Sequence, residues 1–91
     1  MSVYLETLTS DKNNEAIITP AAGKRLHISF MYVKNPLGTG TDAVFSCGGI
    51  THNVPETYET AKNAHITGDV DESLVCTAKA SVVLDIHYEE I

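Results

Sequence analysis

The feature that most constrains this chain is the strict alternation of apolar and polar residues close to its C-terminal end. In the run 82–89, four residues alternate with four others: Val82, Leu84, Ile86 and Tyr88 with Val83, Asp85, His87 and Glu89. Side chains on a strand point to opposite faces with a period of two, so the first four can share one buried face. The run is therefore predicted to be a strand, and we expect Ile91 to pair or pack as part of the fold.

A second alternating run, "RLHISFMYV", occupies residues 25–33. The apolar residues Leu26, Ile28, Phe30 and Tyr32 are expected to face the core, with Arg25, His27, Ser29, Met31 and Val33 on the opposite face. Shorter runs at 43–47 and 74–78 show the same period. They are predicted to bury Ala43, Phe45 and Cys47 in the first and Leu74, Cys76 and Ala78 in the second.

Weaker strand candidates are residues 2–8, 15–20 and 63–67, and Pro20 is expected to stop the second of them because it cannot donate to a ladder. Gly, Pro, Asn and Asp residues between the runs predict turns. The short connection at 80 predicts that residues 73–79 and 81–90 form a hairpin. Residues 55–64 lack alternation, which leaves a turn or two of helix as an alternative there. The spacing predicts an all-β fold: a small antiparallel β-sandwich or jelly-roll-like barrel of six to eight short strands.

Composition narrows the classes of function. The chain has 91 residues, which is one domain (1–91), and residues 1–14 are expected to form either an N-terminal arm or an edge strand. A net charge of −6 with six Lys and Arg argues against nucleic-acid binding. There is no apolar run long enough to cross a bilayer and no secretion signal, so no membrane insertion is expected. Cys47 and Cys76 lack CxxC spacing and are expected to be reduced core residues, with a disulfide as the alternative.

No residue pattern predicts an active site, a metal or a cofactor. If the two longest strands were neighbours, His27, His87 and Asp85 could converge on a metal, but the close ligand spacing of zinc sites is missing and surface histidines are the simpler interpretation. The acidic run 68–72 lacks the ligand pattern of a calcium loop and is expected to be a turn. Cys47 precedes Gly48 and Gly49, yet its inward position predicts an inert thiol.

Three stretches carry a resemblance to a known family. They are Pro20, Gly23 and Lys24 before the first long run, Gly68 followed by Leu74, and the closing Tyr88 and Glu90. Over residues 17–91 the chain resembles the small β-sandwich structural proteins of tailed bacteriophages, accessory parts of the head, neck or tail. The resemblance implies a structural role in the virion without enzyme activity and supplies no functional residue. The free cysteines, and the lack of a threonine- and glycine-rich tract near the start, depart from that family.

The expected function is that of a non-enzymatic virion protein, made in the host bacterial cytoplasm, that self-associates and docks on other virion proteins. Contact is expected through the loops 35–42 and 48–52 and through exposed valines, namely Val33, Val44 and Val83. The alternative is a carbohydrate- or host-surface-binding module. Tyr58 could stack on a sugar ring there, whereas Tyr32 and Tyr88 are expected to point toward the core. An enzyme that uses His27, Asp85 and His87 with a metal ranks last.

Overall fold

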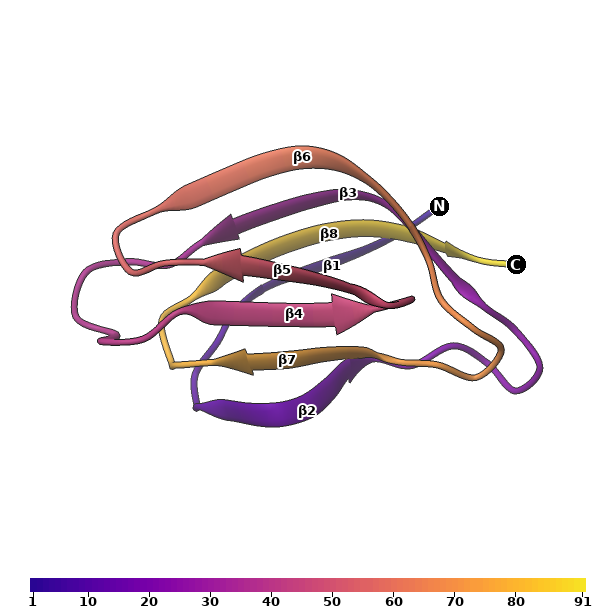
Figure 1. The fold of residues 1–91 in the computed structure, drawn as a ribbon, viewed down its shortest axis with the longest axis horizontal. Coiled ribbons are helices and arrows are strands. Elements are labelled where there is room, and N and C mark those ends of the chain that lie inside the picture. The colour runs from indigo at the N-terminus through magenta and orange to yellow at the C-terminus, as the bar shows by residue number, and fades with distance from the viewer.

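The computed structural model describes all 91 residues and contains eight strands and no helix (Figure 1). The strands are β1 Ser2–Thr7, β2 Lys12–Ile18, β3 Leu26–Lys34, β4 Ala43–Cys47, β5 Ile50–Val54, β6 Glu59–Thr67, β7 Leu74–Ala78 and β8 Val83–Glu90. The all-β prediction is confirmed. Since every regular element is a strand, no helix is available that could span a bilayer.

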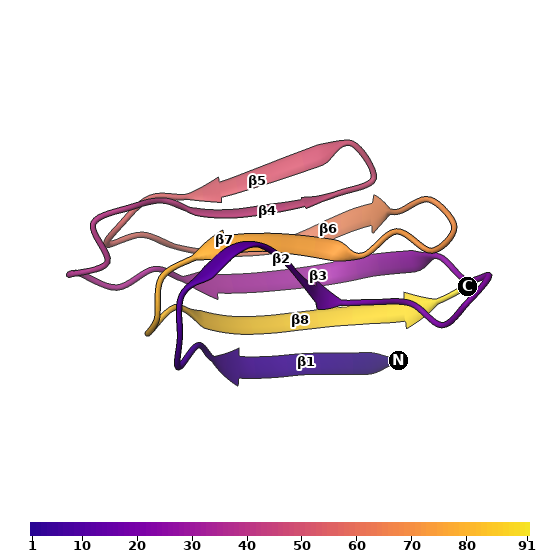
Figure 2. The ribbon, with the colours of Figure 1, turned by 90° about the horizontal axis from the view of Figure 1, so that it is seen from below.

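The strands form two antiparallel sheets of four that pack face to face (Figure 2). Sheet A has the order β1-β8-β3-β6, and sheet B has the order β2-β7-β4-β5. Strand pairs are therefore nested around the β4–β5 turn: β4 with β5, β3 with β6, β2 with β7 and β1 with β8. A long antiparallel hairpin folded over into two sheets has this order, which is that of a jelly roll.

Only β4 and β5 are joined within one sheet. Their connection is Gly48-Gly49, with φ of 60° and 75°, and the positive φ at both positions is typical of the type I′ turn that joins strands most tightly. The predicted hairpin between residues 73–79 and 81–90 is wrong. β7 belongs to sheet B and β8 to sheet A, so the short link between them crosses from one sheet to the other.

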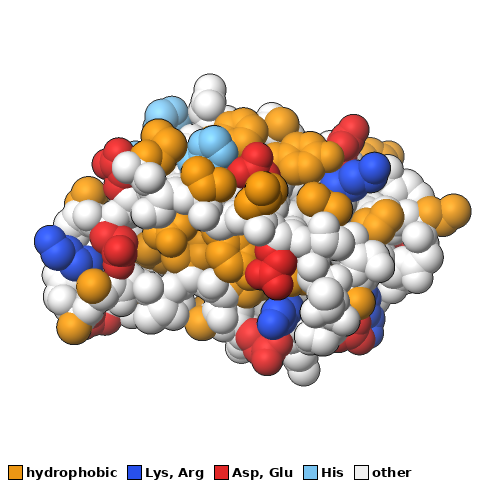
Figure 3. Space-filling model, turned by 180° about the vertical axis from the view of Figure 1, so that it is seen from behind, with side chains coloured by type: hydrophobic (Ala, Val, Ile, Leu, Met, Phe, Trp, Pro, Cys, Tyr) orange, Lys and Arg blue, Asp and Glu red, His pale blue; other side chains and the backbone are white.

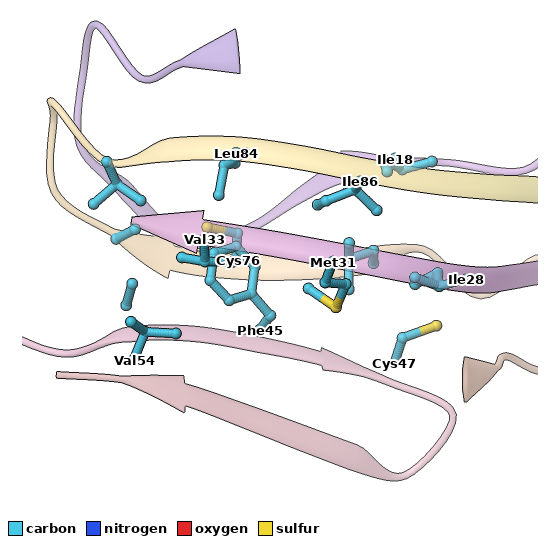
Figure 4. Close-up of a cluster of buried hydrophobic side chains, with 14 of the residues drawn as sticks. Ile18, Ile28, Met31, Val33, Phe45, Cys47, Val54, Cys76, Leu84 and Ile86 are labelled. Atoms are coloured by element: carbon cyan, nitrogen blue, oxygen red, sulfur yellow. The ribbon is translucent and has the colours of Figure 1, made fainter. Parts of the chain in front are cut away.

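The core lies between the sheets and is made of alternate residues from their strands. Figure 4 shows Met31 and Val33 of β3 and Phe45 of β4 pointing toward one another across this space. Seventeen buried side chains form one cluster: Leu8, Ile18, Leu26, Ile28, Met31, Val33, Ala43, Phe45, Cys47, Val54, Ile66, Leu74, Cys76, Ala78, Val82, Leu84 and Ile86. The predicted buried faces of the runs 43–47, 74–78 and 82–88 are confirmed, with Tyr88 partly buried against the cluster.

The buried face predicted for β3 is correct only in its first half. Between Ile28 and Phe30, two steps along β3 face a single step along β8, which marks a β-bulge at Ser29. The register of β3 with β6 shifts at the same place, with the extra residue on β6. One extra residue reverses the alternation beyond it. Leu26 and Ile28 are buried as predicted, whereas Met31 and Val33 replace Phe30 and Tyr32 in the core.

Four further expectations concern single segments. The loop expected at 48–52 is wrong, because only Gly48-Gly49 forms a turn and β5 begins at Ile50. The helical alternative for residues 55–64 is wrong, because Pro55–Tyr58 forms a turn and β6 follows from Glu59. Strand β2 ends at Ile18, before Pro20, as expected. Ile91 exchanges two backbone hydrogen bonds with Arg25, at 2.8 and 2.9 Å, so the last residue is paired.

Candidate interaction surface

The bulge in β3 gives the outer side of sheet A an apolar character. Strand register places outward side chains in rows across β1, β8, β3 and β6: Val3, His87, Phe30 and Asn63 in one row, and Leu5, Asp85, Tyr32 and Ala61 in the next. We call the outward side chains Val3, Leu5, Phe30, Tyr32, Val83, Asp85 and His87 the sheet A face. The upper part of Figure 3 shows hydrophobic side chains interspersed there with histidine and acidic ones.

Exposure along this surface differs between the edge and the middle of the sheet. Val3 and Leu5 on the edge strand β1 are 54% and 72% exposed, while Phe30, Tyr32 and Val83 on the inner strands are half-buried by their neighbours. Large apolar side chains on the edge of a sheet are costly in water, so a contiguous group of them points to a contact surface.

The polar groups of the sheet A face are held by one another. The His87 Nε2 atom lies 3.0 Å from Asp85 Oδ1, and the His87 ring packs edge-on against Phe30 with centroids 5.1 Å apart. The Tyr32 hydroxyl donates to Glu59 Oε2 at 2.6 Å, and this hydrogen bond is the main cause that raises the pKa of Tyr32. These contacts fix the orientation of the aromatic rings on the surface.

The two histidines that were considered as a metal pair, His27 and His87, are on adjacent strands, but they do not converge. His27 lies before the bulge and pairs across the sheet with Glu89, while His87 pairs with Phe30. His27 contacts the Thr67 hydroxyl instead, with Nδ1 to Oγ1 at 2.9 Å. The structure places no three His, Cys, Asp or Glu side chains where they could hold a metal ion together.

Both cysteines lie unbonded in the core. Burial raises the pKa of Cys76 to about 11. The pKa of Cys47 is also raised, first by burial and then by the negative charges of Glu72 and Asp69. A thiol that stays protonated is a poor nucleophile, so neither residue is poised for chemistry at neutral pH.

The acidic run 68–72 forms a turn that ties several loops together. The Glu72 carboxylate accepts from the backbone amides of Asp69 (2.8 Å) and Gly48 (3.2 Å), and Asp71 Oδ1 accepts from the Gly23 amide at 2.7 Å. These oxygens are engaged by the protein's own backbone. The turn predicted for this run is confirmed.

The loop 35–42 is organised around a buried amide. Asn35 is 1% exposed, and its Nδ2 group donates to the carbonyls of Thr41 (2.8 Å) and Val54 (2.9 Å) while Oδ1 accepts from the Thr39 hydroxyl (2.7 Å). A buried polar side chain needs such partners, because an unsatisfied amide costs folding free energy. The sequence analysis missed Asn35, and "NP" before a glycine-rich loop was the only available signal.

Beside Asn35, the loop forms a shallow depression of about 410 Å³. Its lining includes Tyr58 and Leu37, which are 62% and 82% exposed. Tyr58 is exposed, as the carbohydrate-binding alternative requires. Tyr88 packs toward the core as expected, but the prediction for Tyr32 is wrong, because the bulge turns it outward.

Of the three valines predicted to make contacts, Val33 is wrong, since it is fully buried by the reversal in β3. Val83 and Val44 are both half-buried, on the outer sides of sheets A and B respectively. Val83 lies at the end of the sheet A face, with Thr7 and Lys34 as its cross-strand neighbours. Val44 has the polar cross-strand neighbours Asn53 and Thr77.

Comparison with family models, with curated proteins and with solved structures finds no match to this chain.

Proposed function

We propose that this protein is a non-enzymatic structural protein that works by associating with itself and docking on a larger assembly, a phage virion. The observation that carries the proposal is the sheet A face, a surface of apolar and aromatic side chains whose most exposed members are Val3 and Leu5. Burying such side chains against another protein removes their apolar area from water, which is the main favourable term in protein association.

The size of the domain supports the same proposal. A chain of 91 residues buries a smaller share of its surface than larger domains do, so contacts with other chains add usefully to its stability. Docking of many copies on one particle also makes weak contacts effective, because the first contact raises the local concentration for the next.

The virion itself is proposed from the resemblance of residues 17–91 to phage structural proteins. A jelly roll is compatible with this role, as it occurs in capsid proteins, but also in lectins and cupins, so the fold leaves the choice open. The neighbouring genes test the assignment. Capsid, portal or tail genes beside this one would support it, and a metabolic gene cluster would contradict it.

The contact surface is tested by sedimentation over a wide range of protein concentration. Val3→Lys places a charge among the exposed apolar side chains of the sheet A face and is expected to weaken association strongly. The matched control is Val70→Lys, a valine of similar exposure (47%, against 54% for Val3) in the turn 68–72, outside that face, which should leave association unchanged. A wild-type protein that stays monomeric at high concentration, or equal effects of both variants, would contradict the proposal.

The second candidate is a carbohydrate-binding module, favoured by exposed Tyr58 beside the depression at the loop 35–42. An aromatic ring open to solvent can stack on the apolar face of a sugar, and the neighbouring Thr57, Lys34 and Glu59 offer hydrogen-bonding groups. A glycan array decides between the candidates. Binding that is lost in Tyr58→Ala and kept in Val3→Lys would favour the carbohydrate module.

A further inference from the structure

The sandwich has four edge strands, and three of them carry features that hinder pairing with another chain. Strand β2 has two register shifts and a positive φ of 53° at Asn14, and β6 has a shift and a positive φ of 50° at His65. Bulges of this kind disrupt the row of backbone groups that a new strand would need. Strand β5 is short and is joined to β6 by a 3.0 Å contact between His52 Nε2 and Thr60 Oγ1.

Strand β1 has none of these features. Its register with β8 runs without a shift from Ser2 to Thr7, and its side chains include no Pro and no Lys. Figure 2 shows β1 as the outermost strand of sheet A, with its far side uncovered. A regular, apolar edge of this kind is a ready template for another strand.

The backbone groups that β1 leaves free follow from alternation. The amide of Leu8 donates to the Val82 carbonyl of the segment leading into β8, at 2.9 Å. In an antiparallel pair, every second residue turns its amide and carbonyl toward the same neighbour. Ser2, Tyr4 and Glu6 therefore form backbone hydrogen bonds with β8. Val3, Leu5 and Thr7 direct their amides and carbonyls away from β8, toward the free edge of the sheet.

We propose that β1 pairs with β1 of a second copy of this chain, antiparallel and about a two-fold axis at Leu5, so that the two A sheets become one continuous sheet. In this register Leu5 faces Leu5 of the second copy, and Val3 faces its Thr7. Each of these pairs joins residues whose backbone groups point toward the free edge. The two residues of a pair can therefore exchange two N–H···O=C hydrogen bonds. The pairing is self-complementary, as a two-fold interface requires.

The side chains of β1 suit this register. On the outer side, Leu5 packs against its own copy and is buried together with Val3, the two exposed apolar residues of the strand. On the inner side, Tyr4 faces Glu6 of the second copy, which places a hydroxyl donor opposite each carboxylate. In the single chain the Tyr4 hydroxyl donates its one proton to its own Glu6 Oε2 at 2.6 Å, and pairing exchanges this hydrogen bond for the same one to Glu6 of the second copy. The Glu6 carboxylates of the two copies thus do not lie directly opposite each other.

This inference rests on the proposed self-association and specifies its geometry. The decisive variant is Leu5→Pro, which removes the Leu5 backbone amide at the free edge of β1. No hydrogen bond to β8 is lost, so the monomer keeps its fold. The matched control is Leu5→Ser, which loses the same side chain but keeps the amide. Sedimentation equilibrium should show loss of the dimer in Leu5→Pro at concentrations where Leu5→Ser still dimerises, with thermal unfolding confirming that both are folded.

Amide hydrogen exchange provides an independent readout. On raising the wild-type concentration, the amides of Val3, Leu5 and Thr7 should become protected, while those of Tyr4 and Glu6 are protected already. Dimerisation of Leu5→Pro equal to that of Leu5→Ser would overturn the edge pairing and leave self-association through the sheet A face standing. A monomeric wild type would overturn both.

Discussion

At the scale of single residues, the bulge at Ser29 turns Phe30 out of the core. The two phenylalanines of the chain, Phe30 and Phe45, are therefore expected to contribute differently to stability. Phe45 is 1% exposed in the centre of the core, whereas Phe30 lies half-buried on the sheet A face against the His87 ring. Phe45→Ala is expected to lower the free energy of unfolding by about 3–5 kcal/mol, the range for a large aromatic residue in a packed core. Phe30→Ala should cost clearly less, about 1–2 kcal/mol, since part of the ring is in water already.

Urea unfolding of the two variants checks this difference. Alternation alone would have placed Phe30 in the core and given it the larger cost. A loss for Phe30→Ala that equals the loss for Phe45→Ala would mean that the bulge, and with it the outward position of Tyr32, is wrong.

At the scale of elements, the β4–β5 turn distinguishes two adjacent glycines. Both have positive φ, but a Cβ atom on Gly48 would lie 2.3 Å from the Thr67 carbonyl oxygen, while one on Gly49 meets nothing within 4 Å. Gly49→Ala should therefore cost only the backbone strain of the left-handed region, about 1–2 kcal/mol. Gly48→Ala adds a clash with backbone and should lower the melting temperature considerably further.

Thermal unfolding of the two alanine variants, followed by circular dichroism, measures the difference. Equal melting temperatures would show that the turn moves away from the end of β6 without cost. Gly48→Ala is expected to have the lower melting temperature because the start of the β6–β7 link lies over the turn. The sequence of neither segment reveals this contact by itself.

Strand β3 shows at the same scale how far prediction from sequence reaches. The alternation of 25–33 identifies a strand correctly, and Leu26 and Ile28 are buried as predicted. The pattern carries no sign of the bulge, because "SFMYV" is apolar on both faces beyond Ser29 and fits either register. The neighbours β6 and β8 decide it, and both are distant in the sequence.

At the scale of the whole molecule, stability is expected to fall in acid because carboxylates hold the loops at one end of the sandwich. The Glu56 carboxylate accepts from the amides of Gly38 (2.7 Å) and Gly40 (2.9 Å), and these bonds lower its pKa. Asp11 accepts from the Ala80 amide at 2.9 Å, which, with Lys79, lowers the pKa of Asp11 as well.

A folded-state pKa below that of the unfolded chain means that the unfolded state binds protons first as the pH falls. The stabilisation is present above about pH 4.3, the ordinary value for Glu, and is lost as the pH falls through the lower folded pKa. Glu56→Gln should flatten the pH dependence of the free energy of unfolding below that point. Urea titrations of both proteins between pH 6 and 3 measure it, and identical slopes would contradict the role of Glu56.

Local sequence identified every strand except β5 and, in most of them, the buried side, because a period of two residues is a property of each strand alone. It missed β5, since residues 48–52 were expected to be a loop. It also marked the turns, such as Gly48-Gly49. The pairing of strands was beyond its reach: β7 and β8 bury the same residues whether they form a hairpin or lie in opposite sheets. Only the packed structure assigns β8 to a place between β1 and β3 and inserts the bulge at Ser29. Those two long-range pairings turn Phe30 and Tyr32 outward and leave β1 as a free edge, which is where the proposed contacts lie.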